Sequence, residues 1–371
     1  MLCSLIVLIK GADSKLNYML FICTSALWIS LVNSTKIPAG DLVNYIDYYR
    51  NVANKTFFDN IFQWDEDTSK EPLYGIYNYV MYYITFGNER LFLFLTSLLD
   101  YVLLYYSLWL VYSKSHIPKG GIICGILAIT FFTQLFTLSL HLVRQILATA
   151  VFMYALTLKS IDHKNHWILM ICATMIHTAT VLLVAISFIP CIYNYIRPIK
   201  LLLLILIFAI FLSFNALIST MIGTTSVEML NYGIHRFGSS VADFTEGVSL
   251  PILIIIIMPG ILICLKTIIA LRKKHTISPL YPFIYLFIFL SVFVLSFFSM
   301  PLLQYRSFML MYPLIPFIYP ICFTKSTSIS KIYWISVSII LFLRFLKTYN
   351  HAPFEFASIG KIIMSPIFGY F

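Results

Sequence analysis

The sequence has very little charge for its length, and this scarcity decides the class of protein. Only 11% of its 371 residues are charged and 60% are hydrophobic, whereas about 25% of the residues of a soluble globular protein are charged. Apolar runs recur along the whole chain, and several approach the ~20 residues that cross a bilayer as a helix. They do not alternate apolar with polar residues as barrel strands do. We therefore predict an all-α transmembrane helical bundle.

The sequence also lacks the usual marks of metal, cofactor and nucleic-acid binding. Its seven cysteines stand singly, without a CxxC pair or a cluster with histidine, which is typical of small buried side chains. Nucleotide-binding glycine motifs, HExxH and GxSxG are missing. The net charge of +10 comes from basic residues in short loops, as in the cytoplasmic loops of membrane proteins. We expect no metal, no cofactor and no nucleic-acid partner.

The apolar segments are expected to form one integral membrane domain over residues 1–371, with about 10 to 12 spans. The candidate spans are Leu16–Val32, Leu91–Tyr112, Gly121–Leu140, Leu142–Leu158, Trp167–Ile189, Leu201–Ser219, Leu250–Leu271, Tyr281–Met300, Phe308–Phe323 and Ile332–Phe345. A further apolar segment, Leu73–Phe86, has only 14 residues. This length predicts a re-entrant or interfacial helix after the first external loop.

Two polar stretches, residues 33–72 and 220–249, are predicted to be external loops. Acidic residues outnumber basic residues in both, and the positive-inside rule places such loops outside the cytoplasm. The basic cluster Arg272-Lys273-Lys274 is predicted to be cytoplasmic by the same rule. Lysines in two further loops would also be cytoplasmic by this rule. That assignment agrees with two external loops only if two of the apolar segments do not cross the membrane, so the topology between Leu91 and Ser219 stays open.

The first external loop places carboxylates beside tyrosines directly after the first span. Asp41 and Tyr45 share one face if this segment is helical, and Asp47 lies two residues beyond Tyr45. A carboxylate beside tyrosines at a membrane surface suits sugar binding and general-base catalysis. An acidic residue that begins an interfacial helix explains the same pattern without a function, so both interpretations stay open.

The same loop ends in Glu71-Pro72-Leu73-Tyr74, at the start of the short apolar segment. An acidic residue before a proline is a typical beginning of a helix. This explains the local pattern but not the short length of the segment, which suits a helix that lines a cavity.

Four basic side chains are candidates for binding an anion. Arg144, followed by Gln145, lies between two apolar segments, and His177 lies inside a predicted span. Arg306 lies near a span end and Arg236 in the second external loop. An ionisable residue inside the membrane is a functional candidate, although snorkelling explains an arginine at a span end and a hydrogen bond to a neighbouring helix explains a lone histidine.

Four short motifs together resemble a known family. They are Gly40-Asp41 with Tyr45, Glu71-Pro72-Leu73-Tyr74, Arg144-Gln145-Ile146-Leu147-Ala148 and His177-Thr178-Ala179. In this order they resemble the EpsG family of bacterial polysaccharide polymerases, which includes many Wzy-type O-antigen polymerases. The resemblance covers roughly the first half of the chain, and the second half contributes only a general likeness.

The resemblance implies a multi-pass enzyme of the bacterial inner (cytoplasmic) membrane, related to the GT-C glycosyltransferases. The implied substrate is an undecaprenyl-diphosphate-linked oligosaccharide repeat. Such repeats would be polymerised into O-antigen or a related surface polysaccharide on the extracytoplasmic side. Membrane lipid and a chain-length regulator protein are the other expected partners.

The residues fit roles in that reaction. We expect Asp41 to be the general base, with Asp47 as second choice. Arg144 is expected to hold the departing diphosphate, because a planar guanidinium binds phosphate oxygens bidentately, and His177 to assist or position it. The other candidate substrate-binding residues are Tyr45, Glu71, Tyr74, Gln145, Arg236 and Arg306.

Two alternatives stay open at the level of sequence. A transporter or flippase for lipid-linked oligosaccharides also needs cations within the membrane, but such proteins commonly contain inverted repeats, and we find no such symmetry. A GT-C glycosyltransferase that adds a single sugar cannot be separated from a polymerase by its sequence.

Overall fold

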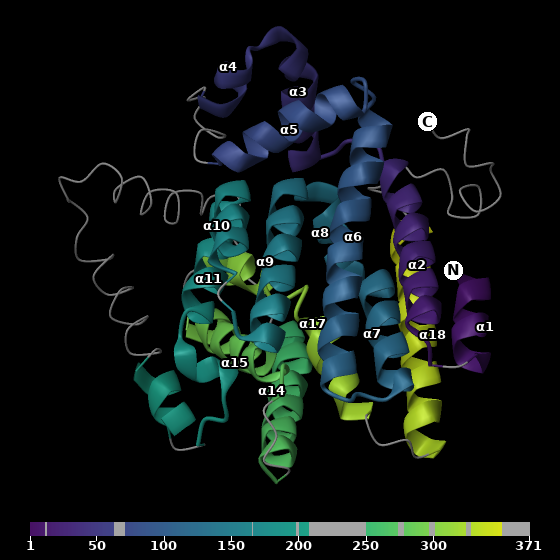
Figure 1. The fold of residues 1–371 in the computed structure, drawn as a ribbon, viewed down its shortest axis with the longest axis vertical. Coiled ribbons are helices and arrows are strands. Elements are labelled where there is room, and N and C mark those ends of the chain that lie inside the picture. Colours follow the sequence, from purple (N-terminus) through teal and green to yellow (C-terminus); the bar gives the residue numbers. More distant parts are fainter. Residues whose placement is uncertain are drawn as a thin grey trace. The chain divides into compact units, whose positions relative to one another are not determined.

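The computed structural model describes the chain except for residues 12, 63–70, 165, 198–199, 208–249, 274–277, 297–300, 324–327 and 351–371. Within the described residues every regular element is a helix (Figure 1), which confirms the predicted all-α class. The second predicted external loop, residues 220–249, lies outside the described residues. The described structure divides into two compact units, residues 1–185 with helix α18 (Ser328–Asn350), and residues 186–322. The count of one membrane domain stays a prediction.

Three described helices are long and apolar enough to cross a membrane. They are α2 (Lys15–Ser34), α6 (Glu89–Lys114) and α14 (Leu250–Lys273). A fourth crossing is formed if α7 (Lys119–Phe131) and α8 (Thr133–His141), which meet at an angle of 47°, count as one broken span. The chain is therefore a multi-pass helical membrane protein.

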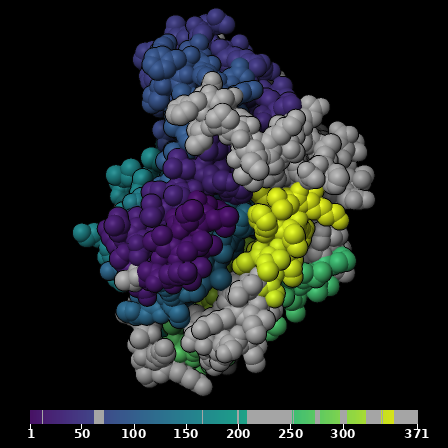
Figure 2. Space-filling model, turned by 90° about the vertical axis from the view of Figure 1, so that its right-hand side faces the viewer, coloured from purple at the N-terminus to yellow at the C-terminus, as the bar shows by residue number. Residues whose placement is uncertain are grey.

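The first unit is built on α2, α6, α9 (Val143–Asp162) and α10 (Trp167–Ile176), each packed on the next. The N-terminal helix α1 (Leu2–Lys10) packs on α2, and α18 packs on α7 and α8. Figure 2 shows α1 and α2 in purple and α18 in yellow on one face of the molecule. Their outward side chains are apolar and exposed, as a lipid-facing surface requires: Leu2, Ile6, Ile9, Leu16, Leu20, Leu27, Ile339, Ile340 and Leu343.

Three short helices form a cap at one end of α6, α9 and α10 (Figure 1). They are α3 (Asp41–Arg50), α4 (Phe57–Phe62) and α5 (Pro72–Ile84). Helix α5 has 13 residues, or about 20 Å at 1.5 Å per residue, and lies across the ends of the long helices. This arrangement is the one expected for the segment Leu73–Phe86.

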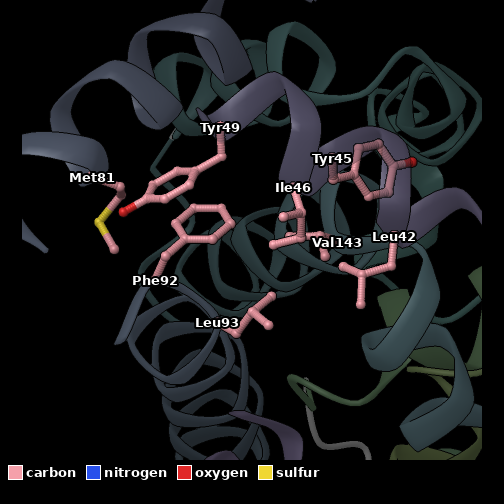
Figure 3. Close-up of a cluster of buried hydrophobic side chains, with 8 residues drawn as sticks. All are labelled: Leu42, Tyr45, Ile46, Tyr49, Met81, Phe92, Leu93 and Val143. Atoms are coloured by element: carbon pink, nitrogen blue, oxygen red, sulfur yellow. The ribbon is translucent and has the colours of Figure 1, made fainter. Parts of the chain in front are cut away.

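The cap is fixed to the bundle by an apolar cluster at its centre (Figure 3). Side chains of α3 contribute one side of this cluster, and side chains of α5, α6 and α9 contribute the other. Its buried members are Leu42, Tyr45, Ile46, Tyr49, Met81, Phe92, Leu93 and Val143. The rings of Tyr49 and Phe92 stack with centroids 4.3 Å apart, so α3 is held firmly over the end of α6.

Three predicted spans are interrupted within the described residues. Gly121–Leu140 is divided at Phe132 between α7 and α8. Trp167–Ile189 is divided at His177 into α10 and α11 (Val181–Ser187), with a 3₁₀ turn (η2, Thr178–Thr180) between them. Phe308–Phe323 is divided among the end of α16 (Pro301–Met309), α17 (Ile315–Ile318) and the 3₁₀ helix η5 (Tyr319–Phe323). A hydropathy average over a window does not reveal such breaks, because the few residues that form them, such as His177 and Thr178, lie within otherwise apolar segments.

The second unit contains α14, α15 (Tyr281–Ser296), α16 and α17. Helix α15 is apolar on all sides and buried along almost its whole length. The rings of Phe283 and Phe317 stack at 5.2 Å, and Gly260 of α14 allows α15 to approach, because a Cβ there would collide with the ring of Phe287. Of the predicted span Leu201–Ser219, only residues 201–207 are described, and they are helical.

Candidate active site

Glu71 is the centre of a buried polar cluster beneath the cap. Its side chain is only 6% exposed. Oε2 accepts a hydrogen bond from a terminal nitrogen of Arg144 at 2.7 Å, and Oε1 accepts from Nδ1 of His177 at 2.5 Å. The backbone N–H of Thr178 donates to the same Oε1 at 3.1 Å. The cluster therefore joins three of the four motifs singled out in the sequence.

The local backbone explains how these groups meet. Pro72 occupies the first turn of α5, where a proline needs no hydrogen-bond donor, and Glu71 directly precedes it. Helix α9 begins after a break at Leu142 (φ −114°, ψ 61°), which leaves Arg144 in its first turn. Helix α10 ends at His177, whose backbone is extended (φ −155°, ψ 122°). The N–H of Thr178 follows this break and is free to donate to a carboxylate.

The cluster stabilises the charged form of Glu71. Burial raises the pKa of this carboxyl group, but the hydrogen bond and charge of His177, the charge of Arg144 and the Thr178 N–H together lower the pKa of Glu71 below its ordinary value. A carboxylate can only accept hydrogen bonds, so Nδ1 of His177 carries a proton. Glu71 therefore fixes the orientation of both Arg144 and His177.

Arg144 lies close to two tyrosine rings, and one of its nitrogen donors, Nε, has no hydrogen-bond partner among the described residues. Its guanidinium carbon lies 4.8 Å from the ring centre of Tyr45 and 5.6 Å from that of Tyr74, within the range of cation–π attraction. Its Nε is buried and makes no hydrogen bond of ordinary geometry to a described residue. A buried donor without a partner is costly, and an anion bound here would satisfy it.

Stacked tyrosines continue from Arg144 along α3 and α5. The Tyr74 ring stacks on the rings of Tyr48 and Tyr77. The distances between ring centroids are 6.4 Å and 6.2 Å, and the interplanar angles are 24° and 26°. The Tyr77 hydroxyl shares a 2.7 Å hydrogen bond with Thr96 of α6. Tyr74 is buried within this row, whereas Tyr48 and Tyr77 on either side of it are partly exposed.

Asp41 lies outside this cluster, on an exposed position at the start of α3. Because α3 is helical, Asp41 and Tyr45 share a face one turn apart, as predicted. The preceding Gly40 has a φ of 59°, a conformation that side-chain-bearing residues rarely adopt. This requirement gives the Gly40-Asp41 motif a structural reason, since the turn at Gly40 places Asp41 at the first position of α3.

The structure does not bring every predicted residue into the cluster. Asp47 pairs with Arg50 on the exposed side of α3 at 3.2 Å. Gln145 is buried in α9 beside Arg144. Arg306 is exposed on α16 in the second unit, and Arg236 lies outside the described residues. The functional roles of all four stay predictions.

Sequence reasoning missed part of this site. The sequence predicts Glu71 as the beginning of a helix and as a candidate substrate-binding residue, whereas in the structure its carboxylate accepts hydrogen bonds from Arg144, His177 and a backbone N–H. Thr178 contributes only its N–H, so no side-chain pattern could identify it. The separations of 73 residues between Glu71 and Arg144 and of 106 between Glu71 and His177 are too large for local spacing to reveal.

Comparison with known proteins is consistent with these motifs. The chain matches the EpsG family over residues 17–359, so the similarity extends well beyond the first half of the sequence. No curated protein and no solved structure matches the chain. Since the family match covers most of the chain, including all of the described residues of the site, this protein belongs to the EpsG family.

Proposed function

We propose that this protein polymerises undecaprenyl-diphosphate-linked oligosaccharide repeats into O-antigen or a related surface polysaccharide. Membership of the EpsG family supports a polysaccharide-related, glycosyltransferase-like role. The observation that carries the proposal is Arg144, a partly buried cation within cation–π range of two tyrosine rings, whose Nε is buried without a hydrogen-bond partner among the described residues. Diphosphate esters of sugars offer such a site both an anion and rings to stack.

In the proposed reaction, the hydroxyl oxygen of an acceptor repeat forms a bond with the anomeric carbon of the donor chain. The bond between that carbon and the lipid diphosphate breaks, and the diphosphate leaves on its lipid carrier with the bonding electrons. Asp41 takes the hydroxyl proton, since its exposed carboxylate lies one helical turn from Tyr45. Arg144 stabilises the negative charge that develops on the diphosphate.

Glu71 and His177 orient the arginine in this scheme. Arg144 hydrogen-bonds to Glu71 and to the Tyr45 side chain, and its Nε, unpartnered among the described residues, remains for a phosphate oxygen. A preorganised donor needs no rearrangement when charge develops. His177 and the Thr178 N–H hold the opposite oxygen of Glu71. We place the reaction on the extracytoplasmic side of a bacterial inner membrane, because the acidic first loop is predicted to lie there.

Deletion of the gene in its bacterium, followed by complementation, tests the proposal. We expect the polysaccharide ladder on a gel to collapse to lipid cores bearing a single repeat, and to be restored by wild type but not by Arg144→Ala. Arg50→Gln is the matched control, because Arg50 pairs with Glu89 on the surface and such pairs contribute about 0–1 kcal/mol.

The other outcomes are equally informative. Loss of every repeat from the surface would place the block before polymerisation and favour a flippase or a single-sugar transferase. An unchanged ladder after deletion, or a full ladder from Arg144→Ala, would contradict the proposal.

A further inference from the structure

A second polar site lies inside the first unit, separate from Glu71 and Arg144. A small cavity of about 10 Å³, close to the minimum that holds one water molecule, is lined by Asn33, Lys36, Leu93, Thr96, Ser97, Asp100, Ser139 and Val143. Lys36 is 7% exposed and Asp100 is 2% exposed. Two ionisable side chains buried at the edge of one cavity call for an explanation.

Lys36 closes the end of α8. Its Nζ donates to the carbonyl oxygens of Ser139 at 3.1 Å and of Leu140 at 2.5 Å. The last carbonyls of a helix have no partner within the helix, and the break at Leu142 removes the partners that a continuous helix would supply. Lys36 therefore stabilises the break from which α9 and Arg144 begin.

The segment that carries Lys36 also leads to the proposed base. Residues 35–40 connect α2 to α3, so they end at Gly40 and Asp41. A second contact ties this segment to the same break, because His141 Nδ1 donates to the carbonyl oxygen of Ala39 at 3.2 Å. The segment before Asp41 and the segment before Arg144 are thus held together by Lys36 and His141.

Asp100 lines the same cavity as Lys36 and is close enough to act on it electrostatically. Its Oδ1 is buried without a hydrogen-bond partner among the described residues, as is Oδ1 of Asn33. An ammonium group has three donors, and two of those of Lys36 are used by the carbonyls. One water in the cavity can accept the third and donate to both buried oxygens, which satisfies every group.

We propose that Lys36 and Asp100 form a water-bridged buried ion pair whose role is to position Asp41 and Tyr45 relative to Arg144. They are positioning residues and do not touch the substrate. This inference rests on the proposed function for its catalytic part, whereas the pairing of the two charges stands on the cavity alone.

The charge on Asp100 matters because Lys36 is buried. Burial lowers the pKa of the Lys36 ammonium to about 7, and the charge of Asp100 opposes this shift. Removing one partner of a buried pair leaves the other charge uncompensated, whereas removing both restores neutrality. The pair therefore predicts strong coupling between the two substitutions.

The test is a double-mutant cycle with Lys36→Met, Asp100→Asn and the double variant, each purified in detergent. We expect each single substitution to lower the midpoint of thermal unfolding. The fall in midpoint of the double variant should be smaller than the sum of the two single falls. Turnover per folded molecule, measured with lipid-linked repeats well below each midpoint, should fall about tenfold to a hundredfold in all three variants. The fall should be in kcat more than in KM, because the substrate contacts remain.

Lys119→Met and Asp13→Asn form the matched control cycle. Lys119 also donates to a backbone carbonyl, that of Gly11 at 2.9 Å, and pairs with the exposed Asp13 at 3.1 Å. Because this pair lies at the surface, the two control substitutions should show little coupling, and the control variants should keep wild-type turnover.

Three results would overturn the inference. Wild-type behaviour of both single variants would show that the charges are unimportant, and strictly additive losses would show that they are not paired. Full turnover from the double variant would leave the pair a purely structural role. Failure of the proposed function is recognised separately, because wild type would then form no ladder while the unfolding midpoints still report the pairing.

Discussion

At the scale of single residues, the site depends on one carboxylate that accepts hydrogen bonds from an arginine and a histidine. Glu71 has both oxygens occupied, by Arg144 on one side and by His177 and the Thr178 N–H on the other. Its substitution should therefore affect stability and activity together. Asp41 is exposed and outside this cluster, so its substitution should affect activity alone.

The first prediction concerns stability against pH. The pKa of Glu71 is lower in the folded protein than its ordinary value, which is about 4.3. A group of this kind stabilises the folded state above its unfolded pKa, and the contribution is lost as the pH falls through the folded pKa. Wild type should therefore be more stable than Glu71→Gln at pH 7, and the difference should shrink below about pH 4.3.

Thermal unfolding of both proteins in detergent between pH 7 and pH 3 measures this difference. Glu89→Gln is the control, because Glu89 forms its ion pair with Arg50 on the surface. A difference between wild type and Glu71→Gln that stays constant over the whole range would contradict the stabilised carboxylate.

The second prediction separates the base from the cluster. Asp41→Asn should lower the rate of chain extension about a hundredfold, within the range of 10² to 10⁴ for general-base catalysis. Because Asp41 is exposed, the unfolding midpoint of the Asp41→Asn variant should stay within about a degree or two of the wild-type midpoint. A normal ladder from Asp41→Asn would remove this residue from the proposed mechanism and direct attention to other carboxylates of the first loop.

At the scale of elements, broken helices bring the motifs together. The breaks at Leu142 and His177 place Arg144 and the Thr178 N–H at helix ends, where backbone and side chains can reach Glu71. Non-helical backbone within a membrane protein is tolerated only where it is buried in protein or lines a cavity. The two breaks and the transverse helix α5 thus build the site from parts that a bundle of straight helices could not supply.

This geometry explains how much the sequence could predict. The apolar runs at α2, α6 and α14 predicted these helices correctly, because length and hydropathy are local properties. The segment Leu73–Phe86 forms the short helix α5 across the ends of the long helices, as expected from its length, and its failure to cross the membrane stays a prediction. The boundary at Leu142 coincides with the division between two apolar segments that the sequence already predicts. The break at His177 lies inside one predicted span, and its contact with Glu71 joins residues too far apart in the chain for local spacing to reveal.

One residue offered a signal that was overlooked. Asp100 is the only acidic side chain inside the apolar segment Leu91–Tyr112, and a carboxylate inside a span is a functional candidate by default. Lys36 is one of several basic residues of the first predicted external loop, and nothing local distinguishes it from the others. The contact between the elements that carry Asp100 and Lys36 could not be predicted from spacing alone.

The third prediction tests the packing of the cap. A Cβ on Gly75 of α5 would lie 2.5 Å from the backbone carbonyl oxygen of Asn60 in α4, so Gly75→Ala should separate the two helices. Overpacking of this kind costs about 1–3 kcal/mol. Gly120→Ala is the control, because a Cβ there meets nothing within 4 Å. Equal unfolding midpoints for the two variants would show that α4 and α5 are not closely packed.

At the scale of the whole molecule, the first unit carries both halves of the proposed chemistry. The cap supplies Asp41, Tyr45, Glu71 and the stacked tyrosines, and the bundle below supplies Arg144 and His177. Exposed apolar side chains on α1, α2 and α18 form the lipid-facing surface of the same unit.

The most direct test is a reconstitution of the purified protein in liposomes with lipid-linked oligosaccharide repeats and no other enzyme. Wild type should convert the single repeats into a ladder of longer chains. Arg144→Ala should slow this conversion about a hundredfold or more, the effect of removing one donor to developing negative charge. A ladder formed at the wild-type rate by folded Arg144→Ala protein would contradict the account.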